Sequence, residues 1–322
     1  MKLATLDTGG DGRLLIVSRD LSRGVFASAA PTLQAAMENW RDVEGDLRRQ
    51  YDAVNAGDDA DAIPVDPRAL AAILPRGYQF LDASAFLAHN HILARAWGFE
   101  PRGEAEPPLM YQGLSNIFYP PHGEVPFRGF DDDVDFEAEF GVIIDAVPRG
   151  VSPDDALGHA RLIIMINDWS LRAFGPDEMK GGFGFLHAKP PSTLSAFAVT
   201  PDELGDDWRD GRVCLPLHVE RNGEAFGRPD GSAMHFGFGE LIAHAARTRD
   251  LCAATVIGSG TVSNYDAATV GSGCIAERRA LDAIDGISPT PYLGAGESVR
   301  LELLDRTGVS IIGMIEQTVC SA

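Results

Sequence analysis

An acidic stretch that runs directly into an apolar one constrains this chain more than any other feature. Residues 134–144 have the sequence VDFEAEFGVII, in which acidic side chains alternate with small or apolar ones before the sequence turns fully apolar. This pattern is typical of a β-strand that enters the core. Because side chains on one face of a strand recur every second residue, Glu137 and Glu139 should point the same way, and Asp135 should join them.

A second apolar run adds another carboxylate. Residues 162–166 (LIIMI) predict a buried strand that ends at Asn167 and Asp168. Carboxylates gathered on a buried strand face are unfavourable unless a cation lies between them. Oxygen donors without cysteine or histidine suit a hard divalent cation such as Mg²⁺, Mn²⁺ or Ca²⁺. The alternative is an acidic edge strand in solvent, where residues 131–133 are expected to lie; the carboxylate at the end of an apolar strand favours the metal site.

Length and net charge limit the architecture and the partners. A chain of 322 residues has room for one large domain and a smaller one. The formal net charge of −20 argues against nucleic acid and against an anionic membrane surface as partners. A small anionic substrate stays compatible with this charge, because a local cluster of cations can override the global field.

The cysteines and the N-terminus indicate a cytoplasmic protein. The four cysteines show no C-x-x-C spacing, which fits reduced thiols better than a disulfide framework or a zinc site. The first 20 residues lack the apolar run of a signal peptide, and no apolar run approaches the length of a membrane span. We therefore expect a soluble, cytoplasmic protein.

The first 72 residues predict a small α+β domain without obvious chemistry. An acidic, proline-containing linker at residues 58–67 follows its last element. Its predicted elements are strands at residues 3–7, 13–18 and 24–27 and a helix over residues 32–54.

Residues 73–322 predict a larger, strand-rich domain. A strand ending at Asp82 precedes a helical pattern over residues 83–97 that places His89 on an apolar face, where a histidine is more often a core residue than a catalyst. Residues 101–130 and 181–193 predict long irregular segments, which are uncommon in a compact domain unless they shape a site. Helices are predicted at residues 152–160 and 239–249, and strands at residues 197–199, 213–221, 225–226, 255–257, 298–304 and 310–315. The fold class is therefore strand-rich α+β.

With these residues in view, the sequence resembles the fumarylacetoacetate hydrolase family over residues 72–322. Five motifs carry the resemblance: Asp82 with His89 seven residues later, DFEAE at residues 135–139, NDWSLR at residues 167–172, Lys189 with Thr193, and GSGTVS at residues 258–263. Several independent spacings agree, which is more specific than any one motif. The resemblance implies a mixed β-roll, the C-terminal fold of fumarylacetoacetases, preceded by a small SH3-like barrel. The residues themselves predict a long helix in that first domain.

The resemblance also implies the site residues. Four carboxylates are implied as ligands of a divalent cation, Mg²⁺ or Ca²⁺ with Mn²⁺ as a further candidate: Asp82, Glu137, Glu139 and Asp168. Four catalytic residues are implied: His89 to activate water, Glu277 to assist it, and Arg172 and Lys189 to stabilise developing negative charge. Two residues are implied to contact substrate: Tyr111 and Thr261.

The implied activity is metal-dependent hydrolysis of a carbon–carbon bond in a 1,3-diketo acid, fumarylacetoacetate or a related acylpyruvate, by a homodimer in aromatic amino acid catabolism. Gly175 departs from the family pattern, because true fumarylacetoacetases have a glutamine there, and this leaves the substrate open. The GSGTVS motif resembles the hydrolases more than the isomerases, decarboxylases and dehydratases. Two alternatives stay open: a metal-dependent decarboxylase or isomerase of a 2-oxo acid, and a non-catalytic metal-binding module. The latter would need neither His89 nor the pair of Arg172 and Lys189.

Overall fold

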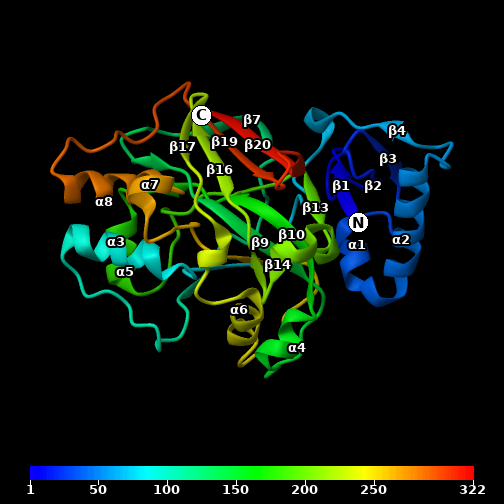
Figure 1. Ribbon diagram of the computed structural model, residues 1–322, viewed down its shortest axis with the longest axis horizontal. Helices are drawn as coiled ribbons and strands as arrows, with labels where there is room; N and C mark the ends of the chain where they lie inside the picture. The colour runs from blue at the N-terminus through cyan, green and yellow to red at the C-terminus, as the bar shows by residue number, and fades with distance from the viewer.

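The computed structural model describes all 322 residues and is built around one large sheet of 11 strands (Figure 1). Ten of its strands follow one another in the order β4 (Ile63–Pro64), β3 (Arg23–Phe26), β2 (Arg13–Val17), β1 (Lys2–Leu6), β13 (Phe197–Val199), β10 (Ala160–Asn167), β9 (Ala138–Ile144), β18 (Thr255–Gly258), β5 (Phe80–Ala83) and β6 (Met110–Gln112). The eleventh, β12 (Thr193–Leu194), pairs with β10.

A second sheet of five strands packs against the large one, and side chains from both form the larger of two main cores. Its strands are, in order, β17 (Glu224–Gly227), β16 (Leu217–Arg221), β19 (Ser298–Leu304), β20 (Ser310–Ser321) and β7 (His122–Phe127). Two short pairs complete the strands: β8 (Val134–Asp135) with β11 (Ser170–Leu171), and β14 (Trp208–Arg209) with β15 (Arg212–Val213).

The helices lie outside the sheets, mostly in two groups at opposite ends of the molecule (Figure 1). At the N-terminal end lie α1 (Leu33–Glu38) and α2 (Trp40–Ala56). At the other end lie α3 (Leu87–Trp97), α5 (Gly175–Gly181), α7 (Ala267–Val270) and α8 (Ile275–Asp285). Between the two ends, α4 (Pro153–Leu157) packs against α6 (Phe238–Ala245). None of the helices has the length and apolar character that crossing a membrane requires.

The N-terminal unit contains the predicted strands, and the predicted helix is split into α1 and α2. The split lies at Asn39, whose backbone leaves the helical region and whose side-chain amide donates to the carbonyl oxygen of Ala35 at 3.0 Å. The SH3-like barrel that the resemblance implied is wrong for this chain, because β1 to β4 form an open antiparallel edge that continues into β13. The division between residues 1–72 and 73–322 stays a prediction, since the sheet and a shared core run across it.

Three differences from the sequence-based expectations bear on the site. The strand predicted over residues 134–144 is interrupted at Phe136 and Glu137, between β8 and β9. The helix predicted from residue 83 begins at Leu87, because β5 extends to Ala83 through its pairing with β6. The segment of residues 101–130 contains β6, which pairs with the preceding strand β5, and β7, which pairs with the distant strand β20.

Candidate active site

The strand directions bring four carboxylates to one end of the large sheet. β9 runs antiparallel to β10, and the backbone N–H of Asp168 donates to the carbonyl oxygen of Glu137 at 3.0 Å. β18 runs antiparallel to β9 and parallel to β5, and its Gly258 is the register partner of Asp82. The beginning of β9 and the ends of β10 and β5 therefore lie side by side.

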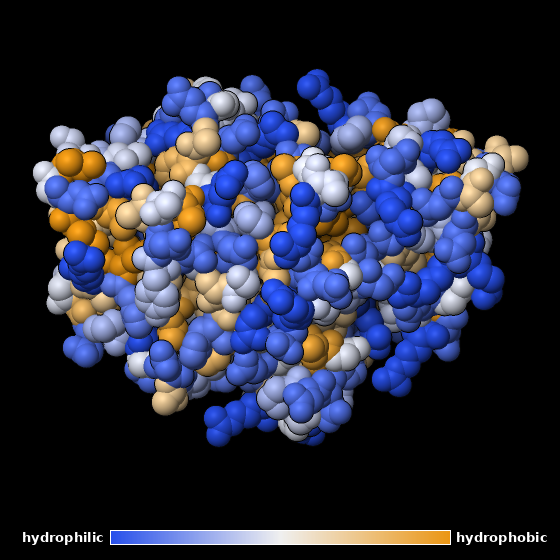
Figure 2. Space-filling view, viewed as in Figure 1, coloured by the Kyte–Doolittle hydropathy of each residue, from blue (hydrophilic) through white to orange (hydrophobic).

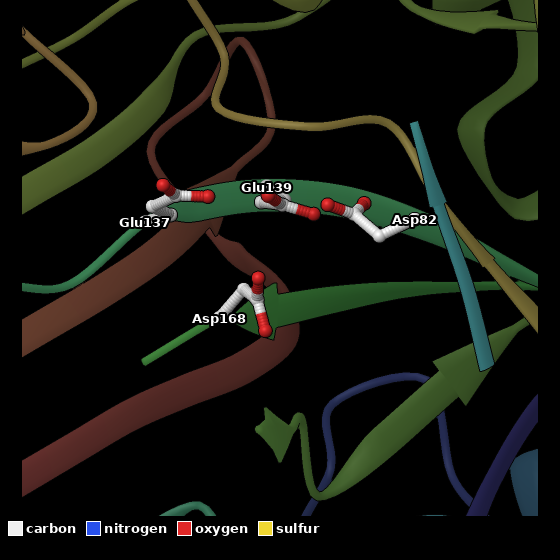
Figure 3. A group of neighbouring side chains, drawn as sticks. All are labelled: Asp82, Glu137, Glu139 and Asp168. Carbon is white, nitrogen blue, oxygen red and sulfur yellow. The ribbon is translucent and has the colours of Figure 1, made fainter. Parts of the chain in front are cut away.

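We call these four residues the acidic cluster: Asp82, Glu137, Glu139 and Asp168. Each offers an oxygen atom, and these atoms all lie within 4.8 Å of one another. Figure 3 shows Glu139 on β9 and Glu137 directly before it, with Asp168, after β10, and Asp82, on β5, close to them. All four residues are buried, and so is every residue of β9. The alternative of a solvated acidic edge strand is therefore wrong, because β9 lies in the interior of the sheet.

The acidic cluster fits a divalent cation. Both carboxylate oxygens of Glu139 are buried without a hydrogen-bond partner, which is unfavourable unless a cation coordinates them. Gly258 leaves room for the carboxylates, because a Cβ atom there would lie 2.3 Å from Oδ1 of Asp82 and 3.0 Å from Oε2 of Glu139. All four donors are oxygens, which suits Mg²⁺, Mn²⁺ or Ca²⁺ better than softer metals.

Burial and mutual repulsion disfavour ionisation of two members of the cluster. Burial, and then the nearby Asp168, raise the pKa of Asp82 to about 7. Burial and the charge of Asp82 raise the pKa of Glu139 well above its usual value. Burial also opposes ionisation of Glu137, but Lys189 and Arg172 more than offset it and hold the pKa of that carboxyl below its usual value. The cluster can therefore gain its full charge at neutral pH only with a compensating cation.

We expect the cation-free protein to lose stability as the pH rises from about 5 to about 8. The pKa of Asp82 is about 7 in the fold against a usual 3.8, so the folded state binds this proton more tightly, and the associated stabilisation is lost as the pH rises through about 7. A divalent cation removes this penalty by pairing with the ionised carboxylates. Thermal unfolding in Mg²⁺ and in EDTA should show a difference in Tm that widens toward pH 8, by about 2–4 °C or more. A difference that narrows toward pH 8 would contradict this assignment.

Two cations border the acidic cluster. The ammonium of Lys189 donates to Glu137 at 2.9 Å and to Asp168 at 2.5 Å. The Nη2 atom of Arg172 lies 2.6 Å from Glu137 and 2.8 Å from Asp135. Burial lowers the pKa of Lys189, but Asp168 and Glu137 more than offset it, so this pKa lies above its usual value. Both side chains are therefore held as cations beside the cluster.

Asp135 does not join the acidic cluster. Its carboxylate accepts hydrogen bonds from the backbone N–H groups of Ile275 and Ala276, at 2.8 and 2.9 Å, and from Nε of Arg172 at 2.8 Å. The prediction that it shares a strand face with Glu137 and Glu139 is wrong, because the strand is interrupted directly after it. Asp135 instead holds the N-terminus of α8 and orients Arg172.

A histidine and a glutamate from two packed helices form a pair beside the cluster. Nδ1 of His89 on α3 lies 2.8 Å from Oε2 of Glu277 in the first turn of α8. The side chain of His89 is 15% exposed and that of Glu277 is fully buried. With the Nδ1 hydrogen held by the carboxylate, Nε2 of the imidazole carries the free electron pair.

A cavity of about 440 Å³ adjoins these groups. Its polar side is formed by His89, Ser170, Arg172 and Lys189. The cavity is also lined by what we call the apolar wall: Leu93, Trp97, Pro176, Met179, Phe185 and Tyr292. The volume lies within the range of small-molecule sites.

The other residues singled out from the sequence, Tyr111, Gly175 and Thr261, differ in where they lie relative to the cavity. Tyr111 donates its hydroxyl to Asp168 at 2.7 Å and packs edge-on against Phe185, so it lies between the acidic cluster and the cavity. Gly175 lines the cavity. Thr261 is buried beyond β18 and is not among the residues that line the cavity, so its contact with substrate stays a prediction.

Sequence reasoning missed three residues that support the site. Ser192 donates its hydroxyl to Asp168, and Ser170 accepts a hydrogen bond from Lys189 at 2.8 Å. Gly258 provides the space for the carboxylates. All three lie within or next to the sequence motifs described above, so their positions in the sequence could have indicated that they belong to the site.

Comparison with known proteins gives the family of the chain. The family model described as Fumarylacetoacetate (FAA) hydrolase C-terminal matches residues 80–320. The chain belongs to the fumarylacetoacetate hydrolase family. A second model, Fumarylacetoacetase N-terminal domain 2, matches residues 1–76. The chain is therefore an enzyme of this superfamily, and the strand-rich α+β class with a fumarylacetoacetase-like fold is confirmed.

One curated relative matches about half of the chain. The curated 2,4-didehydro-3-deoxy-L-rhamnonate hydrolase of Sphingomonas sp. (strain SKA58) is 28% identical over 157 residues, which are 48% of this chain and 52% of the relative. The match thus spans about half the length of that relative.

Two solved structures align over the whole of both chains and show the shared fold. A Mycobacterium smegmatis protein described provisionally as HpcE aligns with a TM-score of 0.71 and 22% identity. Maleylpyruvate hydrolase from Sphingobium sp. SYK-6, solved with manganese (II) and pyruvate, aligns with a TM-score of 0.66 and 17% identity.

Proposed function

We propose that this enzyme is a metal-dependent hydrolase that cleaves a carbon–carbon bond in a 1,3-diketo acid, fumarylacetoacetate or a related acylpyruvate. The observation that carries the proposal is the pair of His89 and Glu277 at the edge of the cavity, beside the acidic cluster. A carboxylate-supported imidazole is suited to activating water, the reactant that distinguishes hydrolysis from other enolate chemistry.

The polar side of the cavity supplies the groups that such a hydrolysis needs. Held by the four carboxylates, a divalent cation would act as a Lewis acid toward the two keto oxygens of the substrate. His89 accepts a proton from water at Nε2 as the water oxygen bonds to the acyl carbon, and Glu277 stabilises the imidazolium that results. Arg172 and Lys189 offset the negative charge that develops on the acyl oxygen. When the carbon–carbon bond breaks, His89 returns its proton to the departing enolate carbon.

Product analysis on a panel of compounds tests the proposal. In the presence of Mg²⁺, Mn²⁺ or Ca²⁺ the wild-type enzyme should convert acylpyruvates to pyruvate and a carboxylic acid, and EDTA should abolish this conversion. The panel includes fumarylacetoacetate, fumarylpyruvate, acetylpyruvate and 2,4-didehydro-3-deoxy-L-rhamnonate, the compound in the name of the curated relative. Equally fast hydrolysis of neutral esters would contradict the assignment, because Arg172 and Lys189 favour an anionic substrate.

Gly175 supports a second candidate, a decarboxylase or isomerase of a 2-oxo acid. Its backbone brings no side chain to the cavity where fumarylacetoacetases have a glutamine, so the substrate contacts differ. These reactions use the same enolate stabilisation without a water nucleophile. Release of CO₂ from a 2-oxo acid, or its isomerisation, with no cleavage of any diketo acid would replace the proposal. Absence of all turnover with retained metal binding would favour a non-catalytic metal-binding module.

We also propose that the enzyme acts in the cytoplasm as a homodimer on a small anionic substrate, with no nucleic acid or membrane partner. The net charge of −20 supports the exclusion of polyanionic partners. Light scattering coupled to gel filtration tests the dimer.

A further inference from the structure

The apolar wall differs in character from the polar residues that line the same cavity. Its residues come from α3, α5, the loop after α5 and the segment after α8, and none of them is charged. Figure 2 shows hydrophobic residues gathered at the end of the molecule that carries α3, α5 and α8. The wall is partly open, since Trp97 is 53% exposed and Met179 64%.

The cations that line the cavity are already paired with protein carboxylates. Lys189 donates to three acceptors, two of them in the acidic cluster. Arg172 is shared between Asp135 and Glu137. The guanidinium of Arg279 lies 4.4 Å from the ring centre of Tyr292, but this arginine donates to a backbone carbonyl and does not line the cavity. The residues that form the apolar wall therefore offer no cation of their own to a second carboxylate of a substrate.

Gly175 adds space rather than polarity to the cavity. A Cβ atom at this position would meet no atom within 4 Å, and the backbone there is not in the left-handed region. A larger side chain would therefore be tolerated at this position. Because glycine has no side chain, the start of α5 presents no side-chain hydrogen-bond donor to the cavity.

We propose that this cavity selects 1,3-diketo acids whose acyl group is apolar, a branched alkyl chain or a phenyl ring, over those whose acyl group ends in a carboxylate. The inference rests on the proposed function for the diketo-acid part of the substrate and narrows the acyl part. An ionised carboxylate placed against the apolar wall would lose part of its hydration without gaining a partner. An alkyl or phenyl group would gain from burial there, by about fourfold in affinity for each methylene that becomes fully buried.

Two matched compounds test the inference: succinylpyruvate, and 4-methylpentanoylpyruvate, in which an isopropyl group replaces the terminal carboxylate. Equilibrium binding of both to the His89→Ala enzyme with Mg²⁺, measured by calorimetry, keeps recognition separate from turnover. We expect the isopropyl compound to bind at least tenfold more tightly. Binding of succinylpyruvate with equal or higher affinity, or binding of neither compound, would overturn the inference.

Two arginine substitutions locate the effect. Met179→Arg in the His89→Ala background places a cation on the apolar wall and should reduce the preference by tenfold or more, mainly through tighter binding of succinylpyruvate. Phe183→Arg adds the same charge on the neighbouring loop, but Phe183 is fully exposed and does not line the cavity, so the preference should persist. If both variants reduced the preference for the isopropyl compound equally, that preference would depend on the overall charge of the protein rather than on the apolar wall. The inference would then be wrong.

Turnover by the wild-type enzyme separates this inference from the proposed function. Cleavage of the isopropyl compound with slower cleavage of succinylpyruvate supports both. If neither compound is cleaved but the isopropyl compound binds more tightly, the proposed function fails and the selectivity of the cavity stands. If succinylpyruvate is cleaved with the higher kcat/KM, the selectivity fails and the hydrolase stands.

Discussion

Replacing Glu139 with glutamine should lower cation affinity by about 100-fold or more and kcat/KM by about 10³-fold at a fixed Mg²⁺ concentration. Both carboxylate oxygens of Glu139 are buried without a partner, so they are available to a cation. Because burial and Asp82 raise the pKa of Glu139 well above its usual value, glutamine resembles the form that this side chain takes when no cation is bound. The cation-free variant should therefore keep the Tm of the wild-type protein, or exceed it.

A matched substitution at another buried carboxylate provides the control. Asp145 accepts two hydrogen bonds from Arg161 and one from His159. It directly follows β9, at the end of that strand away from the acidic cluster. Asp145→Asn should lower Tm, because it leaves Arg161 without its partner, and it should not change cation affinity. Calorimetric titration with Mn²⁺ and thermal unfolding in EDTA measure both quantities on the same samples. Unchanged cation affinity in Glu139→Gln would remove Glu139 from the ligand set.

The acidic cluster could be predicted from the sequence because it depends on local regularities. Side-chain alternation in the sequence predicted Glu137 and Glu139 on one face at the beginning of β9, and the apolar run of β10 placed Asp168 where a buried strand ends. Antiparallel pairing of adjacent strands then brings these positions together. Asp82 came from the resemblance to the family, since its strand joins the others through β18, which lies more than 170 residues away in the sequence.

What the sequence could not supply depends on contacts between distant segments. Asp135 follows the same alternation as Glu137, yet it binds the N-terminus of α8, more than 130 residues later in the chain. The cavity takes its apolar wall from α3, α5 and two loops, and no periodicity within one segment indicates that these meet. The break between α1 and α2 at Asn39 lies inside a continuous helical pattern. These features follow from tertiary packing that overrides local preference.

Replacing His89 with alanine should lower kcat by about 10²–10⁴-fold while leaving cation affinity nearly intact. The imidazole lines the cavity and is paired with Glu277 rather than with the acidic cluster, so the cation ligands should be undisturbed. His91 provides the control on the same helix, because it bonds to the backbone carbonyl of Arg102 and does not line the cavity. His91→Ala should therefore keep kcat within about threefold of the wild-type value.

A double substitution distinguishes a proton acceptor from a merely structural histidine. Glu277→Gln should lower kcat through the orientation of His89, and adding it to His89→Ala should cause little further loss, since both residues act in one step. Metal content and turnover are measured on the same samples. A His89→Ala enzyme that keeps its metal and cleaves diketo acids near the wild-type rate would exclude His89 as the base, and water activation would then have to be assigned to another group in the cavity.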